Sequence, residues 1–204
     1  MIITDIVPKR KKLSALYIDG EFAMKLDTET IITSPYSVGC EISDEQLKEL
    51  IQASDEKRAK EKALWLISYR DHSKRELEEK ISRTSDKDSA KKAVERMEEL
   101  GLVNDEKFAR RYAEDLINVK HMSARGAKYK LREKGIDREL AQQILEELDP
   151  DPSEHIQILI ETKYRNTLNT EKGKRRAVAA LQRMGYSWGD INSVLSQYIE
   201  EEYE

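Results

Sequence analysis

An internal repeat of roughly 48 residues constrains the fold of this chain more than any other feature of its sequence. Three copies follow one another between residues 56 and 200, and each has the apolar spacing of three helices. The expected helices are 56–69, 73–83 and 88–100 in the first copy, 105–119, 123–134 and 137–148 in the second, and 153–164, 170–184 and 187–200 in the third. Because tandem units of this kind pack on their neighbours, we expect a mainly α-helical, elongated array of three tandem three-helix repeats.

Each copy carries the same signals for helix ends. The middle helix begins at a hydroxyl N-cap, and a basic residue follows two positions later. These pairs are Ser73 with Arg75, Ser123 with Arg125, and Thr170 with Lys172. Each copy also contains a helix-ending glycine, and at Gly101 and Gly135 we expect the left-handed conformation of a helix C-cap. In the first copy the glycine closes the third helix rather than the second, so the copies agree in kind rather than residue by residue.

Residues 1–40 have a different pattern, which predicts a small β-hairpin segment. Residues 2–7 are apolar and β-branched, and residues 13–18 and 21–26 flank Asp19-Gly20, a strong signal for a two-residue hairpin turn. The alternating residues Leu16, Ile18, Phe22, Met24 and Leu26 are expected on the buried face of this ribbon. Since a hairpin with one further strand is marginal by itself, we expect it to pack against the helical part.

The chain accordingly divides into five segments. They are a β-rich segment at 1–40, a connecting helix at 41–56, and the three repeats at 57–104, 105–150 and 151–204. Ser43 and Gln46 form a capping box at the start of the connecting helix. That helix either continues into the first repeat or restarts at Ser54-Asp55.

Composition excludes several classes of protein. With 8 Gly and 4 Pro among 204 residues, a loop-rich sandwich and a Pro/Gly-rich disordered chain are both disfavoured. No stretch approaches the ~18 apolar residues of a membrane span, and the first residues lack the apolar core of a signal peptide. The single cysteine, Cys40, excludes an internal disulfide framework. We therefore expect a cytoplasmic protein with no membrane partner.

Charge is distributed unevenly along the chain, although the net charge is only −4. Lys and Arg concentrate at 120–134 and 172–183, and acids concentrate at 137–154 and in the tail at 200–204. Such segregation predicts a basic stripe that meets an acidic protein surface or phosphates; an ordinary solvated helix face is the alternative. The stripe is predicted to contain Arg70, Lys74, Arg75, Lys120, Arg125, Lys128, Arg132, Lys172 and Arg176.

Other conspicuous residues favour structural roles. Phe108 and Tyr112 share a helical face with alanines and leucine, which indicates core rather than base stacking. Gly126 lies inside a helix, where tight packing is favoured over approach of a partner backbone. His72, His121 and His155 are far apart and lack a second ligand at metal spacing. We expect surface positions for His72 and His121, and no catalysis, metal or cofactor.

Four motifs in order resemble those of the RecX family. They are YRDHSKREL at 69–77, LGLVNDEKFARRY at 100–112, Arg125-Gly126 with LREKGI at 131–136, and MGYS at 184–187 with Asp190-Ile191. The similarity covers about residues 57–200, which is all three repeats. The motif residues to which the resemblance gives a structural role are Leu77, Gly101, Leu102, Asp105, Phe108, Ala109, Tyr112, Gly126, Leu131, Gly135, Ile136 and Gly185.

The resemblance implies a non-enzymatic modulator of the RecA recombinase. Proteins of this family bind the filament that RecA forms on single-stranded DNA, and the resemblance implies that this chain inhibits strand exchange, ATP hydrolysis and stimulated repressor cleavage. We expect a monomer whose contacts with DNA are secondary. A helical protein that holds single-stranded or duplex DNA directly through the basic stripe is the alternative, although the sequence pI of about 5.6 favours a protein partner.

Overall fold

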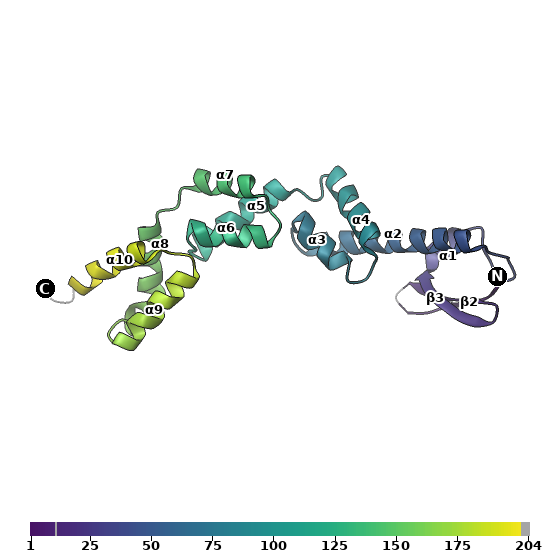
Figure 1. The fold of residues 1–204 in the computed structure, drawn as a ribbon, viewed down its shortest axis with the longest axis horizontal. Helices are drawn as coiled ribbons and strands as arrows, with labels where there is room; N and C mark the ends of the chain where they lie inside the picture. Colours follow the sequence, from purple (N-terminus) through teal and green to yellow (C-terminus); the bar gives the residue numbers. More distant parts are fainter. Residues whose placement is uncertain (11, 201–204) are drawn as a thin grey trace. The chain divides into compact units, whose positions relative to one another are not determined.

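The computed structural model describes residues 1–10 and 12–200 and is mainly α-helical, with a three-stranded sheet at the N-terminus (Figure 1). The predicted fold class, helices with a small N-terminal β segment, is confirmed. The acids at 201–204 and Lys11 of the basic run at 9–12 lie outside the described residues. The chain divides into two compact units, Met1–Asn104 and Asp105–Glu204, which are described separately below.

An antiparallel sheet opens the N-terminal unit, with the strand order β1 (Ile3–Pro8), β2 (Leu13–Ile18) and β3 (Glu21–Asp27). The predicted Asp19-Gly20 turn is confirmed, because both residues have positive φ angles, 49° and 86°, as a type I′ turn requires. A bulge interrupts the pairing of β2 with β3, so that Met24 faces Leu16 but Phe22 faces Tyr17. The expectation that Phe22 shares the buried face was therefore wrong: the extra residue turns its side chain outward, where it is 54% exposed.

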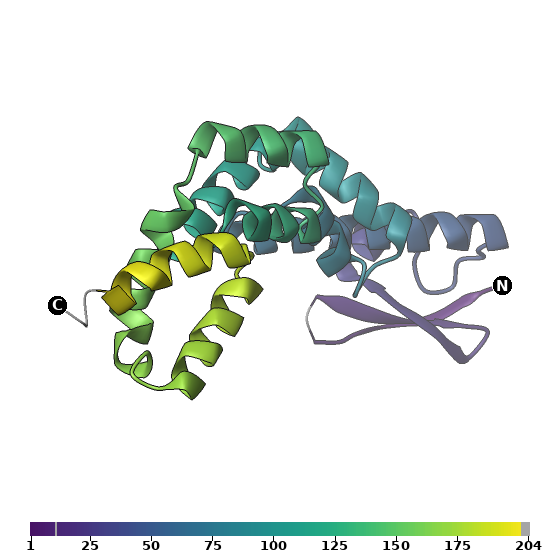
Figure 2. The same ribbon diagram turned by 60° about the vertical axis from the view of Figure 1, so that its left-hand side comes forward.

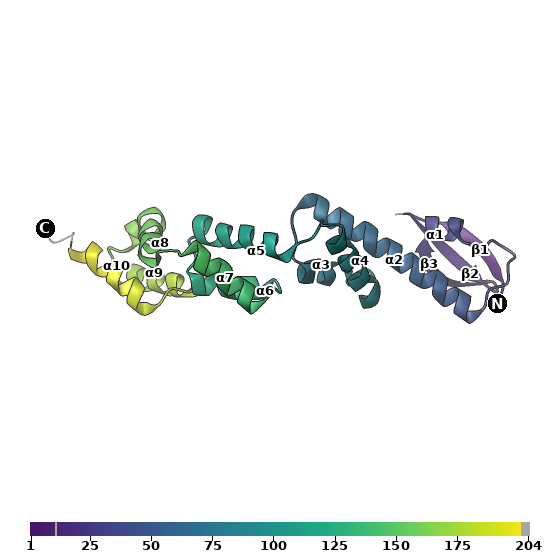
Figure 3. The ribbon, with the colours of Figure 1, turned by 90° about the horizontal axis from the view of Figure 1, so that it is seen from above.

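The sheet packs against one long helix, α2 (Asp44–Tyr69), and the short helix α1 (Thr28–Thr33) lies beside them (Figures 1 and 3). The capping box at Ser43 and Gln46 is present. The helix does not restart at Ser54, whose buried hydroxyl accepts a hydrogen bond from the Asp27 backbone N–H at 2.8 Å. Residue 56, the expected end of the connecting helix, therefore lies within a continuous α2.

Two apolar clusters stabilise this unit, one at each end of α2. The first joins the sheet to the N-terminal half of α2 and contains Ile3, Leu16, Leu26, Ile31, Ile42 and Leu50. The second joins the C-terminal half to α3 (Lys74–Ile81) and α4 (Lys87–Glu99), with Ala59, Ala63, Leu77, Ile81, Val94 and Met97 at its centre. The helix α3 ends two residues before the expected boundary at residue 83. Since α2 contributes to both clusters, it connects the β-rich segment to the first three-helix bundle.

The C-terminal unit contains two three-helix groups. The first comprises α5 (Asp105–Glu114), which ends in the π-helical segment η1 (Asp115–Val119), then α6 (Ala124–Glu133) and α7 (Arg138–Leu148). The second comprises α8 (Pro152–Leu159), the π-helical η2 (Ile160–Tyr164) and 3₁₀ η3 (Arg165–Thr167), then α9 (Glu171–Arg183) and α10 (Trp188–Glu200). Figure 2 shows the short turn between α9 and α10, in yellow-green and yellow.

The glycine punctuation predicted from the sequence is confirmed. Gly101, Gly135 and Gly185 have φ angles of +70°, +81° and +98°, so each occupies the left-handed region that ends a helix. None of the described helices is both long and apolar enough to span a membrane. Over the same residues, no group of three or more His, Cys, Asp or Glu side chains is arranged to hold a metal ion.

Candidate interaction surface

The first turn of α6 is held against the turn that joins α9 to α10. Ser123 caps α6 by accepting a hydrogen bond from the Gly126 N–H at 3.1 Å, and its own N–H and hydroxyl both lie 3.2 Å from the Met184 carbonyl. A Cβ on Gly126 would lie 2.2 Å from that carbonyl oxygen. The prediction that Gly126 serves tight packing is confirmed, although its neighbour is the α9–α10 turn rather than a helix face.

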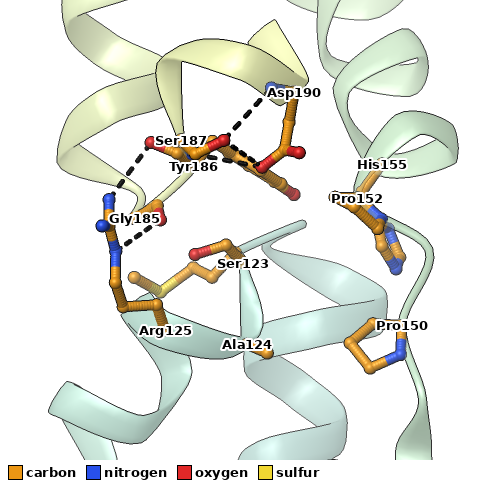
Figure 4. A pocket seen from close by; sticks show the side chains of 11 residues that line it. Ser123, Ala124, Arg125, Pro150, Pro152, His155, Gly185, Tyr186, Ser187 and Asp190 are labelled. Carbon is orange, nitrogen blue, oxygen red and sulfur yellow. Dashed lines mark hydrogen bonds between the residues drawn. The ribbon is translucent and has the colours of Figure 1, made fainter.

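Arg125 takes part in the same junction (Figure 4). Its Nε donates to the Gly185 carbonyl at 2.9 Å and its Nη2 to the Tyr186 carbonyl at 3.2 Å. A guanidinium is well suited to this position, because its forked N–H donors reach both carbonyls of the turn and because the turn follows the negative end of the α9 dipole. Arg125 was predicted only as a partner-facing residue, and the structure gives it a packing role as well.

The exposed face of α6 combines cations with an aromatic ring. Lys128 and Arg132 follow Arg125 at i+3 and i+7, and Tyr129 at i+4 belongs to the same face. The Tyr129 side chain is 62% exposed. Sequence reasoning missed Tyr129, although an aromatic residue among polar positions, three residues before Arg132, was a readable signal.

The cations of α9 are more exposed still. Lys172, Arg175, Arg176 and Arg183 all project into solvent, and Glu171 is the acid that α9 contains. Among the described residues, no ion pair joins these four side chains to a carboxylate. Lys128, Tyr129 and Arg132 on α6 and Lys172, Arg175 and Arg176 on α9 are together called the basic surface below.

The other predicted members of the stripe are neutralised locally. Arg70 pairs with Glu76 at 2.6 Å, Lys74 with Glu98 at 2.8 Å, and Arg75 with Glu79 at 2.9 Å. Lys120 pairs with Asp115 and lies 5.6 Å from the centroid of the Tyr112 ring. Exposed pairs of this kind contribute little to stability, but each carboxylate lowers the positive potential around its cation. The nine predicted residues therefore form two electrostatically different groups.

The family-motif residues lie mostly in the core. Leu77, Phe108, Ala109, Leu131 and Ile136 are buried. Tyr112 is partly buried, and its ring stacks on Phe108 with 5.5 Å between centroids, as predicted for core residues. Asp105 begins α5. Leu102 differs, because it is 47% exposed in the link that follows Gly101.

The histidines do not lie where the sequence suggested. His72 was expected at the surface, but it is 4% exposed, and burial lowers the pKa of its imidazole. His121 and His155 are 34 positions apart, yet their Nδ1 atoms are 3.0 Å from each other. Burial, together with the neighbouring His155 and Lys163, lowers the pKa of His121. The Tyr186 hydroxyl also donates to the His121 carbonyl at 2.8 Å.

A cavity of about 320 Å³ lies beside this histidine pair (Figure 4). Ser123, Arg125, His155, Tyr186 and Asp190 are among the residues that line it. Their polar groups are largely engaged within the fold: Asp190 accepts from the Ser187 hydroxyl at 2.6 Å, and burial raises the pKa of the Tyr186 phenol. The arrangement resembles a packed junction between the two helical groups rather than a catalytic centre.

The sequence of this chain is similar to those of several known proteins. The model of the RecX second three-helix domain matches residues 104–145. Regulatory protein RecX of Clostridioides difficile strain 630 is 27% identical over 193 residues, covering 93% of this chain and 91% of that protein. The same-named protein of Caldanaerobacter subterraneus is 29% identical over 192 residues, covering 93% of each.

Two solved structures share the fold. A crystal structure of regulatory protein RecX aligns with a TM-score of 0.62 at 20% identity, covering 96% of this chain and 98% of the other. The structure of RecX from Lactobacillus salivarius aligns with a TM-score of 0.57 at 23% identity and covers 71% of this chain and 97% of the other.

Proposed function

We propose that this chain, which belongs to the RecX family, regulates the RecA recombinase by binding the RecA–single-stranded-DNA filament through its basic surface. The observation that carries the proposal is the set of cations on α6 and α9, half-buried at Lys128 and exposed at the other positions, that have no carboxylate partner among the described residues. An acidic protein surface or the phosphates of bound DNA would neutralise them. Binding there inhibits strand exchange, ATP hydrolysis and stimulated repressor cleavage.

The proposed role requires no chemistry from the chain itself. The relatives carry the name of regulatory proteins, and the polar groups around the cavity are occupied by contacts within the fold. The protein would act as a monomer in the cytoplasm, where the filament forms. It would need neither cofactor nor metal.

Charge reversal on α6 tests this proposal directly. Lys128→Glu with Arg132→Glu changes a half-buried lysine, whose Nζ donates to the Gln142 side chain, and an exposed arginine, with little effect on helix propensity. Arg125 is left intact because it holds the α9–α10 turn. We expect at least tenfold weaker binding to a filament assembled on labelled single-stranded DNA, measured by fluorescence anisotropy, and a matching loss of ATPase inhibition.

The matched control reverses two exposed acids on the adjacent helix, Glu139→Lys with Glu146→Lys on α7. It should leave filament binding within about twofold of the unchanged protein. If the α7 variant loses binding while the α6 variant keeps it, the basic surface is not the contact surface.

Direct DNA binding is the second candidate, and Tyr129 favours it. An exposed aromatic ring among cations is the combination that holds single strands through stacking and phosphate contacts. Binding to bare single-stranded DNA would then weaken steeply with salt, and Tyr129→Ala would weaken it further. If bare DNA competes fully with the filament at equal nucleotide concentration, direct DNA binding is the better description.

A further inference from the structure

The end of α2 in the N-terminal unit carries two aromatic rings that the core does not use, and we propose that they form a binding site for single-stranded DNA. Trp65 is 50% exposed and Tyr69 is 71% exposed. They are four residues apart, so they share one face of the helix. Their ring centroids are 4.7 Å apart with an interplanar angle of 66°.

The fold does not require these rings. The buried face of this half of α2 is formed by Ala59, Ala63 and Leu66, which pack against α3 and α4. Trp65 and Tyr69 lie outside that cluster. Polar residues at these two positions would allow the helix to form equally well, and they would not expose two large apolar side chains to water. Their presence therefore points to a ligand rather than to packing.

A groove of about 560 Å³ adjoins Trp65 and is lined by Lys12, Arg58 and Lys62. Arg58 pairs with Asp55 at 3.2 Å, whereas the Lys62 Nζ lies 4.0 Å from the centroid of the Trp65 ring. The neighbouring loop between β1 and β2 adds the exposed Lys9 and Arg10. The groove and its border thus include Lys9, Arg10 and Lys12, which the basic surface of α6 and α9 does not contain.

The two acids of the groove are already balanced by cations. Asp27 lies 3.3 Å from the Lys57 Nζ, and Glu61 lies 3.4 Å from the Lys12 Nζ. Lys62, in contrast, contacts the indole ring, and no described carboxylate pairs with it. An incoming phosphate could recruit Lys62 without breaking an ion pair.

Exposed rings beside cations fit the chemistry of an unpaired nucleic-acid strand. Every base offers a face to an aromatic ring, and lysine and arginine follow the backbone without reading sequence. Duplex DNA fits less well, because its bases are already stacked on one another. A protein partner would favour an apolar centre that excludes water, whereas in this groove the apolar side chains of Leu13, Leu64 and Trp65 alternate with charged groups, which include Arg58 and Lys62.

Trp65 can report on its own ligand. The chain has 2 tryptophans, so Trp188→Phe leaves Trp65 as the only indole. The full-length variant is titrated with a thymidine oligonucleotide and with an abasic oligonucleotide of the same length. We expect the thymidine strand to quench Trp65 fluorescence and to bind about tenfold more tightly than the abasic strand, because stacking needs the base.

Anisotropy of the labelled oligonucleotide then tests the rings by substitution. Trp65→Ala and Tyr69→Ala, tested separately, should each weaken binding of the thymidine strand about tenfold. Phe22→Ala is the matched control, since it removes a 54% exposed ring from the sheet of the same unit, and it should leave binding unchanged. Both substituted rings are exposed, so the helical signal should persist in each variant.

Failure here can be told apart from failure of the proposed function. In the Lys128→Glu, Arg132→Glu variant combined with Trp188→Phe, quenching of Trp65 by the thymidine strand should persist. Equal affinity for the thymidine and abasic strands would overturn the stacking site. The site would also be overturned if both ring variants kept oligonucleotide binding but lost filament binding. That result would make this face a protein-docking surface.

Discussion

Gly126 lies in the first turn of α6, and the space that a side chain would need is taken by the carbonyl group of Met184. The helix would gain from alanine by propensity alone. Close approach of another backbone removes that advantage. The guanidinium of Arg125 donates to carbonyls of the same junction. Gly126 and Arg125 therefore both have a packing role within the C-terminal unit.

Gly126→Ala is expected to destabilise the C-terminal unit. The added Cβ would lie 2.2 Å from a backbone oxygen, and overpacking of this kind costs about 1–3 kcal/mol. Urea denaturation followed by circular dichroism measures the change. Gly189→Ala is the control, because its Cβ would meet its nearest neighbour at 3.6 Å; it should be neutral or slightly stabilising. Equal stability of both variants would contradict the close packing.

His72 should make the N-terminal unit sensitive to mild acid. Burial holds the pKa of His72 below its ordinary value of 6.5. Glu76, whose Oε2 lies 3.3 Å from Nδ1, acts in the opposite direction and raises the pKa, but burial has the larger effect. Unfolding releases the imidazole, which then binds a proton more readily, so the contribution of His72 is complete above about pH 6.5 and declines as the pH falls below it.

The measurement compares urea unfolding of the unchanged protein and of His72→Gln at about pH 7.5 and about pH 5.5. The substitution changes the free energy of unfolding at both pH values because packing is lost. From about pH 7.5 to about pH 5.5, however, the variant should lose less stability than the unchanged protein. An identical loss in both proteins would assign the acid sensitivity to other groups.

At the scale of elements, α2 is the part of the N-terminal unit that both apolar clusters share. Its first half packs on the sheet through Leu50, and its second half packs on α3 and α4 through Ala59 and Ala63. Between them, Ser54 and Lys57 bind Asp27 at the end of β3. A continuous helix therefore transmits the position of the sheet to the first bundle.

Deletion of residues 1–40 tests how far the bundle depends on the sheet. The cluster around Ala59, Leu77 and Met97 contains no residue from the deleted segment, so the helical circular dichroism signal and a cooperative melt should persist. Amide exchange should accelerate in residues 44–55, which lose their apolar partners. Loss of the cooperative melt would show that the sheet completes the first bundle.

At the scale of the whole molecule, the threefold repeat predicts an extended particle. Repeats that pack on their neighbours do not close into a sphere. Small-angle scattering should therefore give a radius of gyration above the ~17 Å of a compact chain of this length. A value at that limit would contradict the array. The division into segments at 57–104, 105–150 and 151–204 remains a prediction that limited proteolysis between the repeats can test.

Much of this protein follows from sequence alone, because the signals act between near neighbours. The Asp19-Gly20 turn, the hydroxyl N-caps and the left-handed glycines each depend on a few consecutive residues. Helical stripes such as Ala90, Val94 and Met97 depend only on a regular period. These local rules determined the fold class, and the ordered motifs indicated the family.

Only the tertiary structure decided which distant residues meet. It brought His121 to His155, turned Arg125 toward the carbonyls of the α9–α10 turn, and kept α2 continuous through Ser54. It also separated cations that acids neutralise from those of the basic surface, and it left Trp65 and Tyr69 exposed. Each outcome depends on packing between segments far apart in the chain, and neither residue type nor spacing encodes that packing.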